Sequence, residues 1–149
     1  MQLTKNFSLI EFTSSETAMR KGIDNNPSKA EIENLKALCE NVLQPLRDIY
    51  GKPINITSGY RSPRLNKAIG GSATSQHCFG QAVDFQVPRT EYLRVFEILK
   101  TLPHDQIIWE FGDSIAPLWI HVSYTRTPRF QVLRAYKTML GQTKYELKK

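Results

Sequence analysis

Two short segments with alternating side chains constrain the fold of this chain more than any other feature of its 149 residues. Residues 81–87 alternate so that one side of an expected strand is apolar while Asp84 lies on the other side. Residues 119–124 alternate in the same way and place His121 on the side without aliphatic residues. A polar residue in the middle of each strand, opposite an apolar face, predicts a sheet whose second face carries the chemistry of the protein.

His77 precedes the first of these strands, and Gly80 between them allows the backbone to turn sharply. His77, Asp84 and His121 would then meet as two imidazoles and a carboxylate, the donor set of a zinc site that keeps one position for water. A lone histidine in a strand is more often a half-buried hydrogen-bonding residue than a ligand. The presence of Asp84 within an expected strand needs an explanation such as a metal ion, because aspartate is depleted in strands and costly to bury unpaired. The third histidine, His104, lies in a Leu-Pro-His-Asp stretch that a solvated turn explains.

Four short motifs together resemble the M15 zinc peptidases, the group of D-alanyl-D-alanine carboxypeptidases, dipeptidases and phage endolysins. They are Ser58-Gly59-Tyr60-Arg61-Ser62, Ser75-Gln76-His77 with Gly80 and Asp84, Gln106-Ile107-Ile108-Trp109-Glu110, and Trp119-Ile120-His121-Val122-Ser123. The chain is most similar to the compact single-domain branch found in phages, from about Phe7 to about Tyr124. Each motif alone is weak, but four in the family's order are specific. The resemblance implies a zinc ion held by His77, Asp84 and His121 in a small α+β domain that acts on bacterial cell-wall peptides.

The general base is the point at which this sequence departs from the family pattern. Many members carry an acidic residue three positions before the last histidine ligand, and Leu118 stands there in this chain. Glu110 is the candidate to replace it, because residues 106–111 indicate a strand that could pair antiparallel beside His121. A glutamate in an apolar strand is otherwise an edge residue or half of an ion pair. Asp113 is the second candidate, in a polar turn where aspartate is ordinary.

Arg61 is the candidate to hold the substrate, because its planar guanidinium can bind a terminal carboxylate or an oxyanion with two hydrogen bonds. It follows an expected strand over residues 53–58, and with Tyr60 it resembles the family's substrate-binding segment. Ser75 is a candidate hydrogen-bond donor to the substrate. The ordinary alternatives are a surface arginine bonded to a turn carbonyl and a serine with no role beyond its loop.

These residues predict a zinc-dependent metallopeptidase that hydrolyses peptide bonds in peptidoglycan stems, as a D-Ala-D-Ala type carboxypeptidase or an endolysin endopeptidase. Zinc would activate a water molecule, and Glu110 would act as the general base. Because Leu118 offers no carboxylate, the alternative is a catalytically inactive, zinc-stabilised domain that binds the cell wall or builds a virion. A metallohydrolase of another bond, such as a small amide, stays open as well. Two histidines and a carboxylate can also hold other first-row metal ions.

Composition and periodicity predict one domain over residues 1–149, an α+β fold with helices around a small antiparallel sheet and the zinc site on the sheet's open face. The resemblance implies the M15/hedgehog-like form of this fold. A main helix is expected from Ser28 to Gly51, with Pro45 bending its middle, and a second over residues 90–102. Their inward residues are expected to be Ile32, Leu35, Cys39, Val42, Leu46, Ile49, Leu93, Phe96, Leu99 and Leu102.

The two cysteines, Cys39 and Cys78, form no disulfide framework and match no Cys-x-x-Cys metal spacing. Cys78 is a conceivable alternative ligand, because it follows His77 directly. The first residues show no apolar stretch of a signal peptide, and no run of about 18 apolar residues occurs. We therefore expect synthesis in the cytoplasm without a signal peptide, no membrane insertion, and action at the cell wall if a phage lysis system releases the protein.

Basic residues gather in a C-terminal segment from about residue 125 to residue 149, where lysines and arginines outnumber the single acid, Glu146. Part of the formal net charge of +6 is therefore concentrated at this end of the chain. The segment is explained either as a solvated face or as an attraction to an anionic cell wall. Its aromatic residues form no stacking motif for bases. We expect peptidoglycan peptide stems as partners, no nucleic acid, and a monomer.

Overall fold

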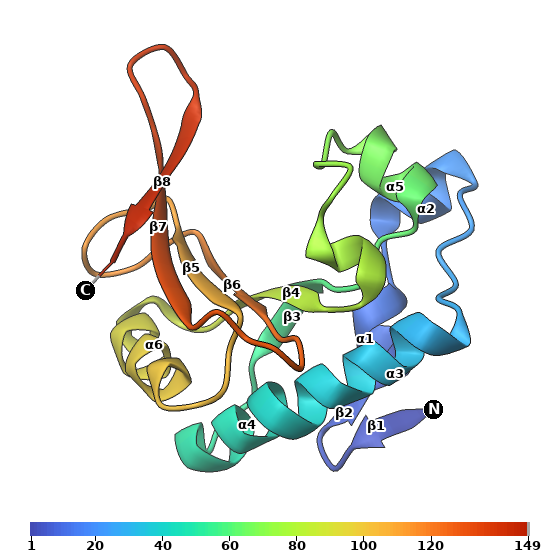
Figure 1. Ribbon diagram of the computed structural model, residues 1–149, viewed down its shortest axis with the longest axis horizontal. Helices are drawn as coiled ribbons and strands as arrows, with labels where there is room; N and C mark the ends of the chain where they lie inside the picture. Colours follow the sequence, from blue (N-terminus) through green and yellow to red (C-terminus); the bar gives the residue numbers. More distant parts are fainter. Residues whose placement is uncertain (149) are drawn as a thin grey trace.

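The computed structural model describes residues 1–148 and arranges the strands in two sheets (Figure 1). The larger sheet has six strands in the spatial order β3-β4-β6-β5-β7-β8, and β1 pairs with β2 in the smaller one. The strands are β1 Gln2–Thr4, β2 Phe7–Ser8, β3 Asn55–Ser58, β4 Ala82–Gln86, β5 Gln106–Glu110, β6 Trp119–Ser123, β7 Gln131–Lys137 and β8 Thr143–Leu147.

Most of the helices come before β4 in the sequence, and the short turn η3 and the helix α6 lie between β4 and β5. Ser8 begins the first helix, since its backbone N–H donates to the carboxylate of Glu11 at 2.7 Å. Gly51 ends α4 in the left-handed conformation, with φ of 80°. The helices are α1 Leu9–Thr13, α2 Glu16–Lys21, α3 Lys29–Leu38, the π-helical turn η1 Cys39–Leu43, α4 Gln44–Tyr50, α5 Pro63–Ala68, the 3-10 turns η2 Gln76–Phe79 and η3 Arg89–Glu91, and α6 Tyr92–Lys100.

The larger sheet is mixed, which corrects the expectation of a purely antiparallel sheet. The pairs β3–β4, β4–β6 and β6–β5 are antiparallel, whereas β7 pairs with β5 in parallel. Strand β6 runs opposite to β5, and the chain reverses direction between β6 and β7. Strand β7 therefore runs in the same direction as β5, and it joins the edge of β5 that β6 does not occupy. Alternating side chains predict which side of a strand is buried, but they do not predict which edge the next strand joins.

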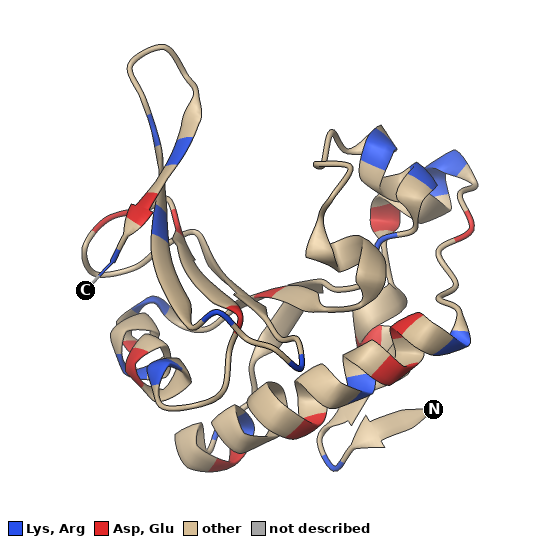
Figure 2. Ribbon diagram, viewed as in Figure 1, with Lys and Arg blue, Asp and Glu red and all other residues tan. Residues whose placement is uncertain are grey.

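The C-terminal basic segment is also more structured than its composition predicts. Over the described residues, β7 and β8 form a hairpin that extends the sheet and carries several lysines and arginines (Figures 1 and 2). Arg129 forms an ion pair with Asp105 at 2.6 Å. The Lys148 ammonium lies 4.8 Å from the centre of the Trp109 ring. Part of this charge is therefore anchored against the sheet and is not carried by a solvated tail.

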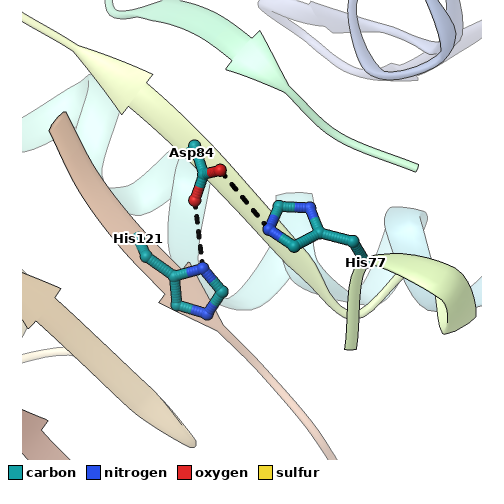
Figure 3. Close-up of side chains that lie close together, drawn as sticks. All are labelled: His77, Asp84 and His121. Atoms are coloured by element: carbon teal, nitrogen blue, oxygen red, sulfur yellow. Dashed lines mark hydrogen bonds and ion pairs between the residues drawn. The ribbon is translucent and has the colours of Figure 1, made fainter. Parts of the chain in front are cut away.

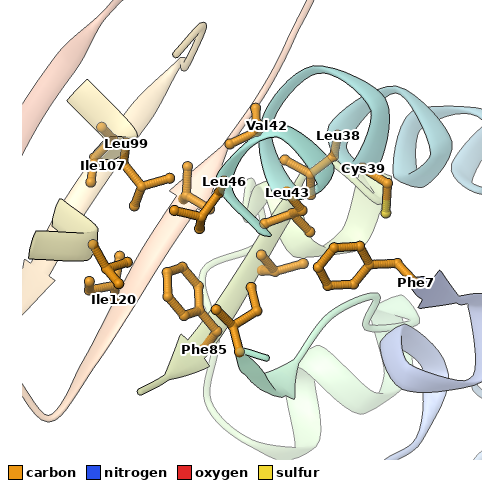
Figure 4. Packing of buried hydrophobic residues seen from close by; sticks show 14 of the residues in the cluster. Phe7, Leu38, Cys39, Val42, Leu43, Leu46, Phe85, Leu99, Ile107 and Ile120 are labelled. Carbon is orange, nitrogen blue, oxygen red and sulfur yellow. The ribbon is translucent and has the colours of Figure 1, made fainter. Parts of the chain in front are cut away.

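The core lies between one face of the larger sheet and the helices α3, η1, α4 and α6 (Figure 4). Phe85 of β4 and Ile120 of β6 are fully buried in it, as the alternation of both strands predicts. Fully burying a side chain of this size contributes about 1.5–3 kcal/mol. The opposite side of the same two strands carries Asp84 and His121 and remains outside the core cluster. The other fully buried members with large side chains are Phe7, Phe12, Leu35, Leu38, Leu43, Leu46, Phe96, Leu99, Ile107 and Trp109.

Two residues expected inside the helices' buried faces are exposed. Ile49 is 55% exposed, and the neighbouring Tyr50 is buried in its place. Leu93 is 49% exposed, while Tyr92 and Val95 are buried. The predictions for Ile49 and Leu93 were wrong. A step of three residues falls short of a full helical turn, so the stripe that begins at Leu93 and has only such steps drifts off the buried face. In the main helix the last step of the buried face is one of four residues, from Leu46 to Tyr50.

The main helix accommodates Pro45 through a π-helical turn that lies directly before it. The Gln44 N–H donates to the carbonyl of Cys39, five residues back along the chain. Proline has no N–H to donate, and its ring would clash with a carbonyl in a regular α-helix. The wider turn relieves both problems and lets the helical path continue into α4.

Cys39 and Cys78 are free, as predicted. Burial raises the pKa of the Cys39 thiol above its ordinary value, so this side chain behaves as a core residue. Within residues 1–148, no helix is long and apolar enough to cross a bilayer.

Candidate metal centre and active-site cleft

His77 lies in the 3-10 turn η2, whose two ends are fixed by neighbouring residues. The Ser75 hydroxyl accepts a hydrogen bond from the His77 N–H at 3.3 Å where the turn begins. Gly80 ends the turn with φ of 69°, in the left-handed region. A Cβ atom at this glycine would stand 2.5 Å from the carbonyl oxygen of Glu31 in α3. The sharp turn predicted at Gly80 is confirmed, and close packing against α3 excludes a larger residue there.

Asp84 and His121 face each other across the ladder of β4 and β6. The two residues are direct partners in the antiparallel register, so their side chains lie on the same side of the sheet. On β5, Ile108 is the partner of His121 and shares that side. The alternation in the sequence predicted this side for both polar residues.

The three side chains converge on one point in front of the sheet (Figure 3). Asp84 Oδ1 lies 3.0 Å from His121 Nδ1, and Asp84 Oδ2 lies 3.5 Å from His77 Nε2. One possible ligand atom from each residue lies within 4.8 Å of the others. Only 4% of the His77 side chain, 18% of Asp84 and 12% of His121 are exposed. The sequence-based prediction that these residues meet is confirmed, and the group could hold a metal ion.

The donor set, two imidazole nitrogens and a carboxylate oxygen, is of the kind that zinc binds. Two ligand atoms of a tetrahedral zinc site stand about 3.3–3.6 Å apart, and the possible ligand atoms of these three residues all lie within 4.8 Å of one another. His77 Nδ1 donates to the Gly59 carbonyl at 2.8 Å, which leaves the lone pair on Nε2 turned toward Asp84. A histidine ligand is commonly oriented by such a hydrogen bond from its second nitrogen.

Burial and pairing set the charges of this group. Burial lowers the pKa of His77, although Asp84 has the opposite effect. The lowered pKa favours the neutral imidazole that a metal ion requires. Burial would raise the pKa of Asp84, but its interactions with His121 and His77 outweigh that effect and lower it below the ordinary value. The cluster therefore offers neutral nitrogen and anionic oxygen to a cation.

Glu110 lies on the same side of the sheet as the three possible ligands. It occupies the position opposite Trp119 in the ladder of β5 and β6, two residues along from the pair formed by Ile108 and His121. Only 8% of the residue is exposed. Burial raises the pKa of Glu110 to about 7, while His121 opposes the rise and the charge of Asp84 adds to it. The antiparallel pairing expected for Glu110 is confirmed.

These side chains line one cleft with a volume of about 830 Å³. Arg61 and Ser75 belong to its wall, and the Arg61 guanidinium donates to the Ser75 hydroxyl at 3.3 Å. Within residues 1–148, Arg61 Nε is buried and has no hydrogen-bond partner. Burial lowers the pKa of Arg61, although the charge of Asp84 opposes this effect. A half-buried guanidinium on the cleft wall is suited to an anionic or carbonyl oxygen that enters the cleft.

The structure does not bring every predicted residue to this cleft. Tyr60 is 5% exposed, and its hydroxyl points to Glu31 at 3.4 Å, away from the cleft lining. Cys78 does not belong to the group that could hold a metal. Asp113 pairs with Arg89 at 2.7 Å in an exposed turn. Leu118, at the position where the family often has an acid, is 54% exposed.

Residues 102–105 were predicted to form a solvated turn, but His104 and Asp105 are buried beside the cleft. His104 is 3% exposed, and its Nδ1 bonds to the Leu102 carbonyl at 2.7 Å, so the prediction of a solvated side chain was wrong. Asp105 accepts from Gln76 at 2.9 Å and from two nitrogens of the Arg129 side chain. Asp105 thereby ties η2, with its histidine, to β5 and to the segment before β7. No local signal in the sequence links these three distant segments.

Replacing Asp105 by asparagine is expected to lower the free energy of unfolding by about 1.5–3 kcal/mol, the contribution of hydrogen bonds to a charged group. Hydrogen bonds from Arg129 hold the pKa of Asp105 below its ordinary value, against the effect of burial. The contribution is therefore complete above the unfolded-state pKa of about 3.9 and disappears as the pH falls through the lower folded-state value. Urea unfolding of both proteins with a chelator present should show equal differences at pH 7 and pH 5 and a smaller one at pH 3. A difference that grows on acidification would contradict this role.

Comparison with known proteins agrees with the geometry. No curated protein matches the chain significantly. A family model described as Peptidase M15 matches residues 5–123, which include His77, Asp84, Glu110 and His121. The matched segment covers most of the 149 residues and nearly coincides with the stretch that carries the resemblance in the sequence. The chain therefore belongs to the peptidase M15 family and is a peptidase of that family.

Proposed function

We propose that this protein is a zinc-dependent peptidase that hydrolyses peptide bonds in the stems of bacterial peptidoglycan. It would act as a D-Ala-D-Ala type carboxypeptidase or as an endolysin endopeptidase. The observation that carries the proposal is the convergence of His77, Asp84 and His121 beside Glu110 in an open cleft. Membership of the peptidase M15 family supports hydrolysis of a peptide bond. The resemblance of the four sequence motifs supports the cell-wall substrate.

Zinc suits the donor set because two imidazoles and one carboxylate leave a fourth tetrahedral position for solvent or substrate. A zinc ion bound there would lower the pKa of a water molecule to about 7 and polarise the scissile carbonyl. The protein contributes the orientation of the ligands. The Gly59 carbonyl fixes the ring of His77, and the sheet register fixes Asp84 against His121.

Glu110 is proposed to move the proton. Its carboxylate would accept a proton from the attacking water and then donate that proton to the nitrogen of the leaving amine. The side chain shares the face and the cleft of the three ligands, and it is largely buried, so its carboxylate is not freely solvated. A buried carboxylate beside an open cation site is suited to this exchange.

Arg61 is proposed to bind the substrate, with the Ser75 hydroxyl beside it in the cleft wall. Replacing Arg61 by methionine is expected to lower kcat/KM about 10- to 100-fold, mainly through a higher KM, because a charge-assisted hydrogen bond to the substrate is lost. The matched control is Arg64→Met, which removes an exposed arginine of α5 outside the cleft lining. Steady-state kinetics would contradict the assignment if both variants kept the KM of the wild type.

An inactive domain that binds the cell wall and uses zinc for stability is the second candidate. The observation that favours it is Leu118, which leaves no carboxylate at the position used by many members of the family. Such a domain would bind purified sacculi without releasing any product. In that case the wild-type protein and the Glu110→Gln variant would bind sacculi equally well.

The test is a digest of purified sacculi and of isolated muropeptides by the zinc-loaded protein, followed by mass spectrometry. Peptidoglycan hydrolysis predicts new amino and carboxyl termini within the stems, and their masses identify the bond that is cut. A chelator should abolish the products, and zinc should restore them. Binding to sacculi without new termini would support the inactive domain, whereas unchanged sacculi with hydrolysis of another amide would point to a different substrate.

A further inference from the structure

The β7–β8 hairpin lies beyond residues 5–123, the segment that matches the family. It nevertheless forms part of the wall of the cleft, to which it contributes Leu133, Thr143 and Tyr145. In Figure 1 the hairpin rises on one side of the sheet, and α5 with the loop before η2 rises on the other. Substrate in the cleft would therefore meet a surface that the family match does not cover.

The register of three strands aligns Tyr145 with the proposed general base. Glu110 of β5 is paired with Ala135 of β7, and Ala135 is paired with Tyr145 of β8. Partners in a ladder share a face, so Tyr145 lies on the face that carries Glu110. Adjacent strands are about 4.8 Å apart, which puts the backbones of these two residues about 10 Å apart. The intervening Ala135 has only a methyl group, which leaves space for the tyrosine ring to extend toward Glu110.

The chemistry of Tyr145 suits a contact with substrate. The residue is 56% exposed, so a ligand can reach it. Tyr145 lines the same cleft as Glu110 and Asp84. Burial raises the pKa of Tyr145, and the charges of Glu110 and Asp84 raise it further. A phenol with an ordinary pKa of about 10 keeps its proton at neutral pH and can donate a hydrogen bond.

We propose that the β7–β8 hairpin carries a substrate subsite in which the Tyr145 hydroxyl donates a hydrogen bond to a carbonyl or carboxylate oxygen of the bound peptide, beside Glu110. Leu133 and Thr143 form the rest of this subsite, and the side chain of Leu133 stands opposite Ile108 in the neighbouring strand. The proposal rests on the proposed function, because it takes the ligand to be a peptide.

The test compares Tyr145→Phe, which removes only the hydroxyl, with Tyr145→Ala in the zinc-loaded full chain. The matched control is Tyr136→Phe on the same hairpin, because Tyr136 alternates with Leu133 and Ala135 and so lies on the opposite face. Steady-state cleavage of a muropeptide should show kcat/KM lowered about tenfold or more in Tyr145→Phe, the effect of losing one hydrogen bond to substrate. Tyr136→Phe should match the wild type, and all three variants should keep the wild-type metal content and melting temperature.

Binding supplies a second readout that does not require turnover. Titration of the muropeptide into Glu110→Gln and into the double variant Glu110→Gln/Tyr145→Phe should show weaker binding by the double variant. Wild-type cleavage with unchanged kinetics and binding in Tyr145→Phe would overturn the subsite and leave the proposed function in place. If Tyr145→Ala lowered kcat/KM and Tyr145→Phe did not, the proposed hydrogen bond would be overturned, because the aromatic ring without its hydroxyl would then be sufficient for wild-type kinetics. A wild type that neither binds nor cleaves muropeptides would overturn both proposals.

Discussion

Replacing Glu110 by glutamine is expected to lower kcat for peptide hydrolysis by about 10²- to 10⁴-fold, the usual contribution of a general acid–base group. Glutamine keeps the size of the side chain and a carbonyl oxygen, but its amide can neither accept nor return the proton of the attacking water. The carboxylate lies on β5 in a strand that is buried on both sides, so the isosteric change preserves the packing. Bound metal and melting temperature should remain those of the wild type.

Asp113→Asn is the matched control for this prediction. Asp113 was the second candidate for the base, and it lies in the turn after β5, paired with Arg89 and outside the cleft lining. Hydrogen bonds, first of all from Arg89, lower the pKa of Asp113 to about 2. Asparagine can still accept the turn's backbone hydrogen bonds, so wild-type kcat is expected. Full activity in Glu110→Gln together with a large loss of kcat in Asp113→Asn would show that Asp113, and not Glu110, is the general base.

Replacing Asp84 by alanine is expected to abolish both tight metal binding and hydrolysis. Of these three residues, Asp84 is the one that pairs through its carboxylate with both of the others, and without it the two imidazoles face each other with no anion between them. Loss of an outer-shell partner already costs about 10- to 100-fold in metal affinity, and loss of a direct ligand should exceed that. Metal content after dialysis, measured by elemental analysis, checks the prediction.

The control for Asp84 is Asp48→Asn, which changes an exposed carboxylate of α4 on the far side of the core. It should retain one metal ion per chain and wild-type activity. Zinc should raise the melting temperature of the wild type and of this control, because a ligand that binds only the folded state stabilises it. The same rise in Asp84→Ala would show that the ion binds elsewhere.

The strands and the ligand group could be predicted because their signals are local. Alternation in β4 and β6 defines a buried side and an open side, and Asp84 and His121 stand on the open one. Gly80 indicates the turn that carries His77 back over the sheet, and only glycine fits so close to α3. Glu110 followed from the same reasoning, since a short connection returns β5 antiparallel to β6.

The parts that could not be predicted depend on contacts between distant segments. Nothing in the sequence of the basic segment indicates that β7 joins the free edge of β5, yet this pairing places Tyr145 in the cleft. Asp105 looked like part of a polar turn because its partner, Arg129, is distant in sequence. His104 looked solvated for the same reason, since the Phe130 ring that packs against it is equally distant. Tyr60 shows the opposite case: its motif predicted a role in the cleft, but its side chain is buried against Glu31.

The most direct measurement is anomalous diffraction at the zinc edge from crystals of the zinc-loaded protein. We expect a single ion bonded at about 2.0–2.2 Å to one nitrogen of His77, one carboxylate oxygen of Asp84 and one nitrogen of His121. Its open side should face the cleft that Glu110 lines. An ion bound by other residues, or no ion between these three side chains at saturating zinc, would contradict the assignment of the metal centre.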